Sequence, residues 1–345
     1  MKICPNRFRL LSLAIAAFLL TGCPDSGSNT PGEGDSASSS DAKKMSIAVI
    51  PKSTGGEFWE TVESGARQAA EELDVEIKWE GTLTETEIAE QNKIIENMIN
   101  LDVDGMAVAP LNSKATSRSV AGAVDADIPV VVFDSALDGD KHLSFVATNN
   151  VAGGELAGKH MVELLEGGKK KIAVLRYVQG TASTENRAKG FVDSVKEAGH
   201  EIVADPFPED GTVAGCKKTA SNTLEGFVDD GKLAIDGIFA CNLTSALGML
   251  AAIEDLRKSG VEVTARFIGF DSSPKLVDGL QASKIDALVS QDPKKMGYLA
   301  VETIVKHLQG EEIEKMVDTG VELVTAKRLE NEDAIRELVG LKPKK

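Results

Sequence analysis

Seven side chains that could hold a polar small molecule occur where short apolar runs meet predicted helices. Carboxylates accept hydrogen bonds from hydroxyl groups, a guanidinium donates them, amides do both, and aromatic rings pack against C–H faces. This set of side chains suits a neutral polyol. The candidate binding residues are Phe58, Trp59, Asp134, Arg187, Asn242, Asp271 and Gln291.

The elements that must position these residues alternate between strands and helices. Apolar runs predict strands, and helical spacing of apolar residues predicts the segments between them. Strands joined through helices form parallel sheets with right-handed crossovers, and such sheets bind ligands beyond the carboxyl ends of their strands. The alternation of strands and helices runs through the chain twice in succession, which predicts an α/β fold with two doubly wound parallel-sheet lobes. The predicted strands include 46–50, 105–109, 129–133, 171–176, 236–240, 266–270 and 285–289, and the predicted helices include 58–73, 113–125, 184–198 and 243–258.

The N-terminal segment is predicted to be a targeting signal. Within residues 1–22, basic residues precede an apolar run at 10–20 that is too short for a stable membrane span. The run ends in Leu-Thr-Gly-Cys, which resembles a bacterial lipobox and implies cleavage before Cys23 and its lipidation. An ordinary signal peptide with an incidental cysteine is the alternative. Residues 23–44 are rich in Ser, Gly and Asp and predict a flexible tether. These features place the folded body on the periplasmic side of the cell envelope, lipid-anchored to a membrane.

The composition excludes several classes of protein. The 345 residues contain 54 acidic and 38 basic residues and carry a net charge of −16, which opposes nucleic-acid binding. The four cysteines include no C-x-x-C pair, so a structural zinc site is not expected. The glycines at 153–158 lack dinucleotide-binding spacing, and Asp138-Gly139-Asp140 lacks the rest of a calcium loop. We therefore expect neither a metal nor a cofactor.

As a set, the junctions between predicted strands and helices resemble those of the ribose-binding protein type of periplasmic sugar-binding protein. That type shares its fold with the effector core of LacI-type repressors. The resemblance covers about residues 46–325. Its most specific segments are Phe58-Trp59, Val131 to Asp134, Gly180-Thr181 with Arg187 and Gly190-Phe191, Ala240 to Asn242 with Ala246 to Gly248, Ile268 to Asp271, and Ser290-Gln291.

The resemblance implies a cleft between two lobes joined by a three-stranded hinge. The N-terminal lobe would comprise 46–148 and 292–319, and the C-terminal lobe 149–291 and 320–345. Phe58, Trp59 and Asp134 would then face Arg187, Asn242 and Asp271, with Gln291 at a hinge. The sequence departs from the family at Gly56-Glu57, where Asn-Pro is frequent, at Ser135, where Arg or Asn is frequent, and at Leu243, where an acidic residue is usual. Because two of these departures touch the ligand, a pentose is not implied.

Several candidate residues also have a purely structural interpretation. Trp59 continues a helical apolar stripe and could belong to the core. Asp134 and Asp271 could be helix N-caps, Arg187 could be a solvated surface charge, and Asn242 and Gln291 could be ordinary polar loop ends. Cys216 and Cys241 could form a disulfide outside the cytoplasm.

Three functions follow from these expectations. The first is a monomeric, non-enzymatic solute receptor that closes on a monosaccharide and delivers it to an ABC permease. The second is a sensor subunit that presents a sugar or a furanosyl signal to a membrane receptor. The third is an extracytoplasmic glycoside hydrolase that uses Asp134 and Asp271 as its acid and base. No nucleophile motif favours the hydrolase.

Overall fold

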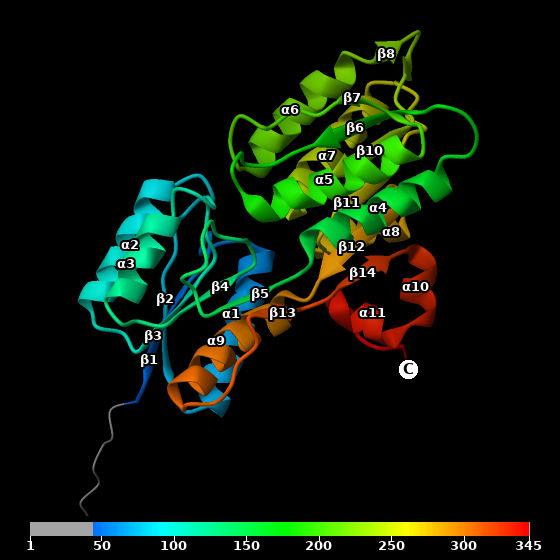
Figure 1. Ribbon diagram of the computed structural model, residues 1–345. Helices are drawn as coiled ribbons and strands as arrows, with labels where there is room; N and C mark the ends of the chain where they lie inside the picture. Colours follow the sequence, from blue (N-terminus) through cyan, green and yellow to red (C-terminus); the bar gives the residue numbers. More distant parts are fainter. Residues whose placement is uncertain (1–43, 345) are drawn as a thin grey trace, which may run out of the picture. The chain divides into compact units, whose positions relative to one another are not determined.

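The computed structural model of the chain describes residues 44–344. The predicted signal peptide, Cys23 and nearly all of the predicted tether lie outside the described residues. Within 44–344 the chain forms two six-stranded sheets, each accompanied by helices (Figure 1). No helix in this range combines the length and the apolar character that a membrane span needs.

The first sheet is built mainly from the N-terminal part of the chain. Its strand order is β13-β5-β4-β3-β1-β2, and every neighbouring pair is parallel. The chain returns to this sheet near its C-terminal end through the edge strand β13. The strands are β1 (Ser46–Ile50), β2 (Glu76–Trp79), β3 (Gly105–Val108), β4 (Val130–Phe133), β5 (Ser144–Ala147) and β13 (Met316–Asp318).

Helices cover both faces of this sheet because its strands are apolar on both sides. In β1, Ile47 and Val49 pack with α1 (Glu57–Glu72) and α9 (Pro293–Leu308). Ala48 and Ile50, one residue further along, pack with α2 (Ile88–Asn100) and α3 (Ser117–Asp125) on the other face. Because successive side chains of a strand point to opposite faces of the sheet, the core of this lobe is divided into two layers.

The start of α3 corrects one sequence prediction. The helix begins at Ser117, whereas the apolar spacing predicted a start at 113. The preceding residues form a turn because Asn112 Oδ1 accepts hydrogen bonds from the backbone N–H groups of Lys114 and Ala115, at 3.2 and 2.9 Å. Asparagine favours such local turns over a helix.

The second sheet has the strand order β14-β12-β11-β10-β6-β7. Its strands are parallel except at one edge, where β14 runs antiparallel to β12. This edge differs from the purely parallel sheet that the alternation predicted, because β14 reaches the sheet directly from β13 and not through a helix. The strands are β6 (Lys171–Leu175), β7 (Glu201–Ala204), β10 (Gly237–Ala240), β11 (Arg266–Phe270), β12 (Ala287–Gln291) and β14 (Val321–Val324).

In the sequence, the remaining helices and strands directly precede the first strand of the second sheet, lie between its strands, or follow its last strand. A short hairpin precedes β10, and two short helices follow β14 (Figure 1). These elements are α4 (Asn150–Leu164), α5 (Ala182–Glu197), α6 (Val213–Glu225), β8 (Val228–Asp229), β9 (Lys232–Leu233), α7 (Leu243–Lys258), α8 (Pro274–Gln281), α10 (Ala326–Asn331) and α11 (Asp333–Leu338).

Three connections carry the chain between the two sheets. They run from β5 into α4, from β12 into α9, and from β13 into β14. Two of them touch, since Thr148 Oγ1 lies 3.3 Å from Thr319 Oγ1 and donates to the carbonyl oxygen of Gly320 at 3.1 Å. These hydrogen bonds hold the connection after β5 against the connection between β13 and β14.

Helix α5, which carries Arg187, is held against α4 by glycines. A Cβ atom on Gly154 would lie 2.0 Å from the carbonyl oxygen of Arg187, and one on Gly190 would lie 2.2 Å from that of Val151. No larger residue fits between these backbones. The glycines thus fix the position from which Arg187 projects.

A Gly154→Ala variant is expected to lose about 1–3 kcal/mol of unfolding free energy, because the added methyl group meets rigid backbone. The matched control is Gly122→Ala in α3, where a Cβ atom meets nothing within 4 Å. That control should gain up to about 1 kcal/mol from helix propensity. Urea unfolding of both variants measures the difference, and equal effects would contradict the packing.

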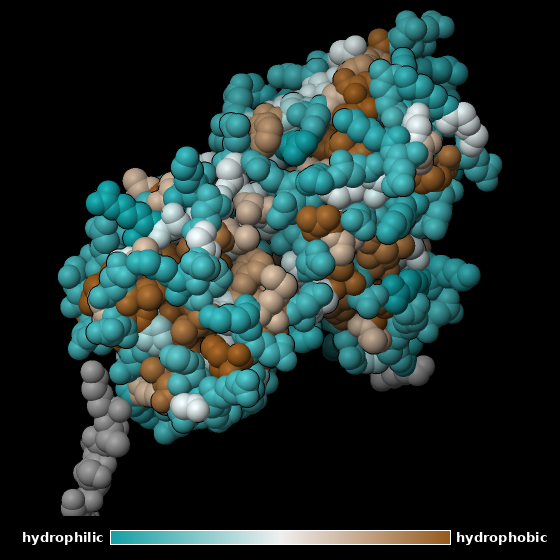
Figure 2. All heavy atoms as spheres, viewed as in Figure 1, coloured by the Kyte–Doolittle hydropathy of each residue, from teal (hydrophilic) through white to brown (hydrophobic). Residues whose placement is uncertain are grey.

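The visible face of the protein is covered mainly by hydrophilic side chains, with hydrophobic residues in small groups between them (Figure 2). Six large hydrophobic side chains are exposed within the described residues. Two of them, Leu83 and Val213, border the cavity described below. The exposed set is Leu83, Leu101, Phe207, Val213, Leu308 and Met316.

Candidate ligand-binding site

A cavity of about 240 Å³ lies where strand ends of the two sheets meet. Its wall contains residues that follow β1, β2 and β4 on one side, and residues that follow β6, β7, β10 and β11, together with Gln291 at the end of β12, on the other. The structure brings all seven sequence-predicted candidates to this wall: Phe58, Trp59, Asp134, Arg187, Asn242, Asp271 and Gln291.

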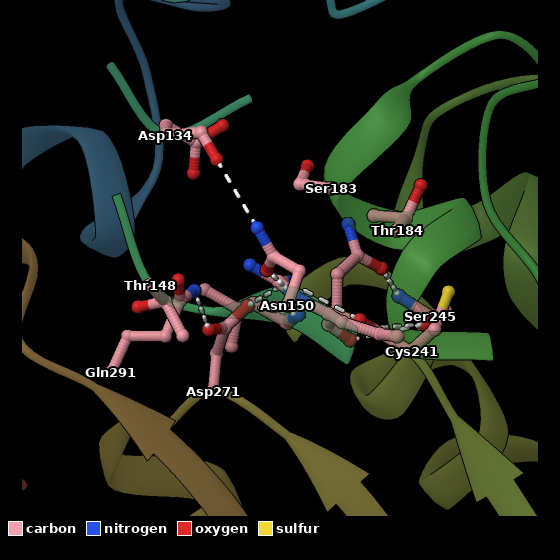
Figure 3. A network of polar contacts seen from close by, with 12 residues as sticks. Asp134, Thr148, Asn150, Ser183, Thr184, Cys241, Ser245, Asp271 and Gln291 are labelled. Atoms are coloured by element: carbon pink, nitrogen blue, oxygen red, sulfur yellow. Dashed lines mark hydrogen bonds and ion pairs between the residues drawn. The ribbon is translucent and has the colours of Figure 1, made fainter. Parts of the chain in front are cut away.

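Asp134 follows β4 in a left-handed backbone conformation, with φ of 61°. No helix starts after it, since the next element is β5, so the N-cap interpretation is wrong. Its Oδ2 lies 2.6 Å from Lys52 Nζ, and both side chains are almost fully buried. Figure 3 shows the contact of its backbone carbonyl oxygen with Asn150 Nδ2 at 3.5 Å. Asp134 is therefore a buried, ion-paired carboxylate at the cavity wall.

Asp271 follows β11 in a similar conformation, with φ of 68°. It does not cap α8, because Ser273 occupies that position. Its carboxylate accepts hydrogen bonds from Gln291 Nε2 at 2.7 Å (Figure 3) and from the backbone N–H of Leu243 at 2.9 Å. Burial raises the pKa of Asp271 above its ordinary value, and the nearby positive charge of Arg187 opposes that rise.

Arg187 is buried in α5, so the interpretation as a solvated surface charge is wrong. Its Nε donates to Asn150 Oδ1 at 2.7 Å, and its Nη1 donates to the carbonyl oxygen of Cys241 at 3.3 Å. The guanidinium lies 4.0 Å from the centre of the Phe270 ring and 3.7 Å from Asp271 Oδ2. These partners hold the guanidinium plane in one orientation at the cavity.

The two aromatic residues at the start of α1 have different environments. Phe58 is half-buried and meets Trp59 edge-on, with ring centres 5.0 Å apart. Trp59 is buried and packs against Phe133, so it belongs to the core while its edge reaches the cavity. Trp59 is therefore a core residue that also borders the cavity, and its contact with a ligand stays a prediction.

The two amides also have structural roles. Asn242 is the N-cap of α7, and its Oδ1 accepts the backbone N–H of Ser245 at 3.0 Å. Its amide nitrogen is not used in that cap, so it can donate to a ligand. Gln291 orients Asp271 through the hydrogen bond described above. Neither residue is an ordinary polar loop end.

Several cavity residues were not singled out from the sequence. Lys52 is the second residue after β1, Glu85 lies in the loop between β2 and α2, and Tyr177 is the second residue after β6. Tyr177 Oη donates to the carbonyl oxygen of Gly211 at 2.9 Å. All three come after a strand in the sequence, but only their positions in the structure show that they line the cavity.

Of the cavity residues that the sequence analysis did not single out, Glu85 is the one with an acidic side chain. Its Oε1 accepts a hydrogen bond from Trp59 Nε1 at 2.8 Å. Burial raises the pKa of Glu85, while the charge of Lys52 and the indole hydrogen bond act in the opposite direction. The cavity therefore contains three carboxylates.

Polar contacts join the two lobes around the first turn of α5. Lys52 Nζ donates to Ser183 Oγ at 3.1 Å, and the backbone N–H of Ser183 donates to Ser135 Oγ at 3.0 Å. Thr181 Oγ1 donates to the carbonyl oxygen of Leu111 at 3.0 Å. Ser135, at the position where the sequence departs from the family, is thus fully buried at a lobe-to-lobe contact.

The disulfide that the sequence left open is not formed, because Cys216 and Cys241 are both free thiols in the structure. Both are fully buried, and burial raises the pKa of each to about 12. Among residues 44–344, no group of three or more metal-ligating side chains comes together.

Native protein at pH 8 is expected to leave Cys216 and Cys241 unmodified by an alkylating reagent, because a thiol with a raised pKa is almost entirely protonated and these two are inaccessible. The same reagent in urea should modify both. Peptide mass spectrometry measures each site separately, and rapid native modification at either would contradict the buried environment.

Comparison with known proteins places this geometry in context. Residues 47–312 match the model of the periplasmic binding protein domain. The chain belongs to that family. The ribose import binding protein RbsB of Bacillus subtilis is 27% identical over 315 residues, which are 91% of this chain and 97% of that protein. The D-ribose/D-allose-binding protein of Pseudomonas aeruginosa is 29% identical, over 82% of this chain and 90% of that protein.

Solved periplasmic binding proteins have the same fold as this one. An ABC transporter solute-binding protein from Agrobacterium vitis with bound D-fucose superimposes with a TM-score of 0.79 at 33% identity, covering 85% of this chain and 99% of that one. A carbohydrate transporter solute-binding protein from Agrobacterium radiobacter in complex with D-arabinose gives a TM-score of 0.80 at 29% identity, covering 87% and 100%. These matches confirm the predicted fold class and family.

Proposed function

We propose that this periplasmic binding protein captures a monosaccharide in the cavity between its lobes and delivers it to an ABC permease. The observation that carries the proposal is the convergence of Asp134 from one lobe with Arg187 and Asp271 from the other. A molecule that bridges these groups stabilises one arrangement of the lobes, which a permease can distinguish from the empty protein.

The cavity supports a small polyol as the ligand. Its volume of about 240 Å³ is below that of most drug-sized pockets, which favours one sugar ring over an oligosaccharide. Micromolar affinity requires about −8 kcal/mol. Four or five charge-assisted hydrogen bonds of roughly 1.5–3 kcal/mol each, with ring packing on Phe58, reach that value after ordering costs.

The carboxylates support binding and not hydrolysis. Asp134 is paired with Lys52, and Asp271 is held by Gln291 and Leu243. These contacts orient the carboxylates toward hydroxyl groups of a bound sugar. The named relatives are import and binding proteins, which supports the same function.

The site of action follows from the family and from the N-terminal sequence. Members of this family act outside the cytoplasm, and anchoring through a lipidated Cys23 would keep the protein beside the permease. Mass spectrometry of the membrane-extracted protein tests the anchor, with a diacylglyceryl-modified N-terminal Cys23 as the expected result. An unmodified N-terminus would contradict it.

A thermal-shift screen against pentoses, hexoses, deoxyhexoses and amino sugars tests the proposed function, because a ligand that binds only the folded state stabilises it by mass action. We expect at least one monosaccharide to raise the melting temperature and to bind with micromolar or tighter affinity in calorimetry. The absence of binding by every sugar would contradict the proposal.

A further inference from the structure

The cavity wall contains more acidic than basic side chains. Its basic side chains are Lys52 and Arg187, and its acidic side chains are Glu85, Asp134 and Asp271. Lys52 lies 2.6 Å from Asp134, and Arg187 lies 3.7 Å from Asp271. Within residues 44–344, no cationic group comes within 4.0 Å of the Glu85 carboxylate. Among the three carboxylates of the cavity, Glu85 is thus the one without a cationic side chain beside it in the described residues.

Glu85 is held in place by a neutral donor. Its single hydrogen bond within the described part of the chain comes from Trp59 Nε1 at 2.8 Å. The indole cannot follow a moving carboxylate, since it is wedged edge-on between the rings of Phe58 and Phe133. One carboxylate oxygen is therefore fixed, and the other is left for a group inside the cavity.

Two further cavity atoms lack hydrogen-bond partners, and both are acceptors. Asp134 Oδ2 contacts Lys52 as an ion pair but without hydrogen-bond geometry, and Gln291 Oε1 has no partner. Buried acceptors are costly unless a donor reaches them. Together with Glu85, these atoms require a ligand that is rich in donors.

We propose that the ligand is an amino-substituted monosaccharide whose ammonium group binds Glu85. This inference rests on the proposed sugar-binding function. An ammonium group brings three N–H donors and one positive charge, so it satisfies the free oxygen of Glu85 and pairs with the ionised carboxylate. A neutral sugar supplies donors but no counter-charge, so it does not stabilise the ionised form of Glu85, which burial disfavours.

The groups around Glu85 determine how binding depends on pH. Lys52, Asp134 and Asp271 act on it as charges, and the charge of Glu85 in turn helps to raise the pKa values of Tyr177 and Cys216, which keeps both neutral. Because burial raises the pKa of Glu85 in the empty cavity, acid favours its protonated form. An ammonium favours the ionised form, so affinity for an amino sugar should fall as the pH drops through that raised pKa.

Calorimetric titration of the full chain with matched sugar pairs tests the proposal. The probes are D-glucose and D-galactose, each with its 2-amino, 3-amino and 6-amino derivatives, at pH 7. In at least one pair, we expect the amino sugar to bind at least about tenfold more tightly than its neutral partner, which corresponds to one charge-assisted contact. The preference should shrink at pH 5.

The variant Glu85→Gln removes the charge while keeping the shape and the acceptor for Trp59. It should abolish the preference for the amino sugar over its neutral partner. The matched control is Glu80→Gln, which removes the same charge from the segment after β2, where the side chain is exposed and outside the cavity. It should keep the preference.

Two results would overturn the inference: neutral sugars that bind at least as tightly as every amino partner, or a preference that persists in Glu85→Gln. Either result leaves the proposed function intact, because sugar is still bound. If no sugar of either kind binds, the proposed function itself fails, and this inference fails with it.

Discussion

Replacing Arg187 by alanine is expected to weaken sugar binding by at least about a hundredfold. The reason is that the guanidinium would donate two charge-assisted hydrogen bonds to the sugar, of roughly 1.5–3 kcal/mol each, and the variant loses both. Asp271 is then left in the cavity without its counter-charge, which raises its pKa further. Leaving a buried charge unpaired also costs about 3 kcal/mol of unfolding free energy.

Two companion variants separate binding from folding. Arg187→Lys keeps the charge but loses the planar donors that reach Asn150 and Cys241, so its affinity should lie between those of the wild type and Arg187→Ala. Lys189→Ala removes an exposed positive charge from the same helix and should bind normally. Calorimetry and urea unfolding measure both quantities. Wild-type affinity in Arg187→Ala would remove Arg187 from the site.

The second large effect is expected for the buried pair of Lys52 and Asp134. Lys52→Met should lower the unfolding free energy by about 3–5 kcal/mol, because it leaves the Asp134 carboxylate buried and unpaired. The double variant Lys52→Met/Asp134→Asn should recover much of that loss, since no charge then remains. Sugar affinity should nevertheless fall at least about tenfold in Asp134→Asn, which loses an ionised acceptor.

A double-mutant cycle for this pair isolates the interaction energy, which should exceed about 1.5 kcal/mol. The exposed pair Lys141 and Asp125 provides the control cycle and should show little coupling. Additive effects at Lys52 and Asp134 would mean that the pair does not exist in solution.

The strand-end rule predicted much of this site from the sequence. The apolar segments before Asp134 and Asp271 are short and continuous, so their ends could be located without a structure. Each parallel sheet places such ends on one edge, and it was the resemblance to the ribose-binding protein type that implied that the ends of the two sheets face each other. The left-handed conformations of both aspartates are a further common feature that the sequence did not reveal.

Other features depend on contacts that no local pattern encodes. A lysine after β1 reads as a solvated charge, and only the position of Asp134 shows that Lys52 is buried. Glu85 lies in a polar loop of ordinary appearance, and its role depends on the orientation of the Trp59 indole. The antiparallel direction of the edge strand β14 was also not predicted, because it depends on how the chain returns from the first sheet.

A crystal structure of the protein with the tightest sugar from the thermal-shift screen tests the central claim most directly. We predict the sugar in the cavity between the lobes, with hydroxyl or ammonium groups within hydrogen-bond distance of Asp134, Arg187 and Asp271, and one face of the ring against Phe58. A sugar bound elsewhere on the protein, with this cavity empty, would contradict the account.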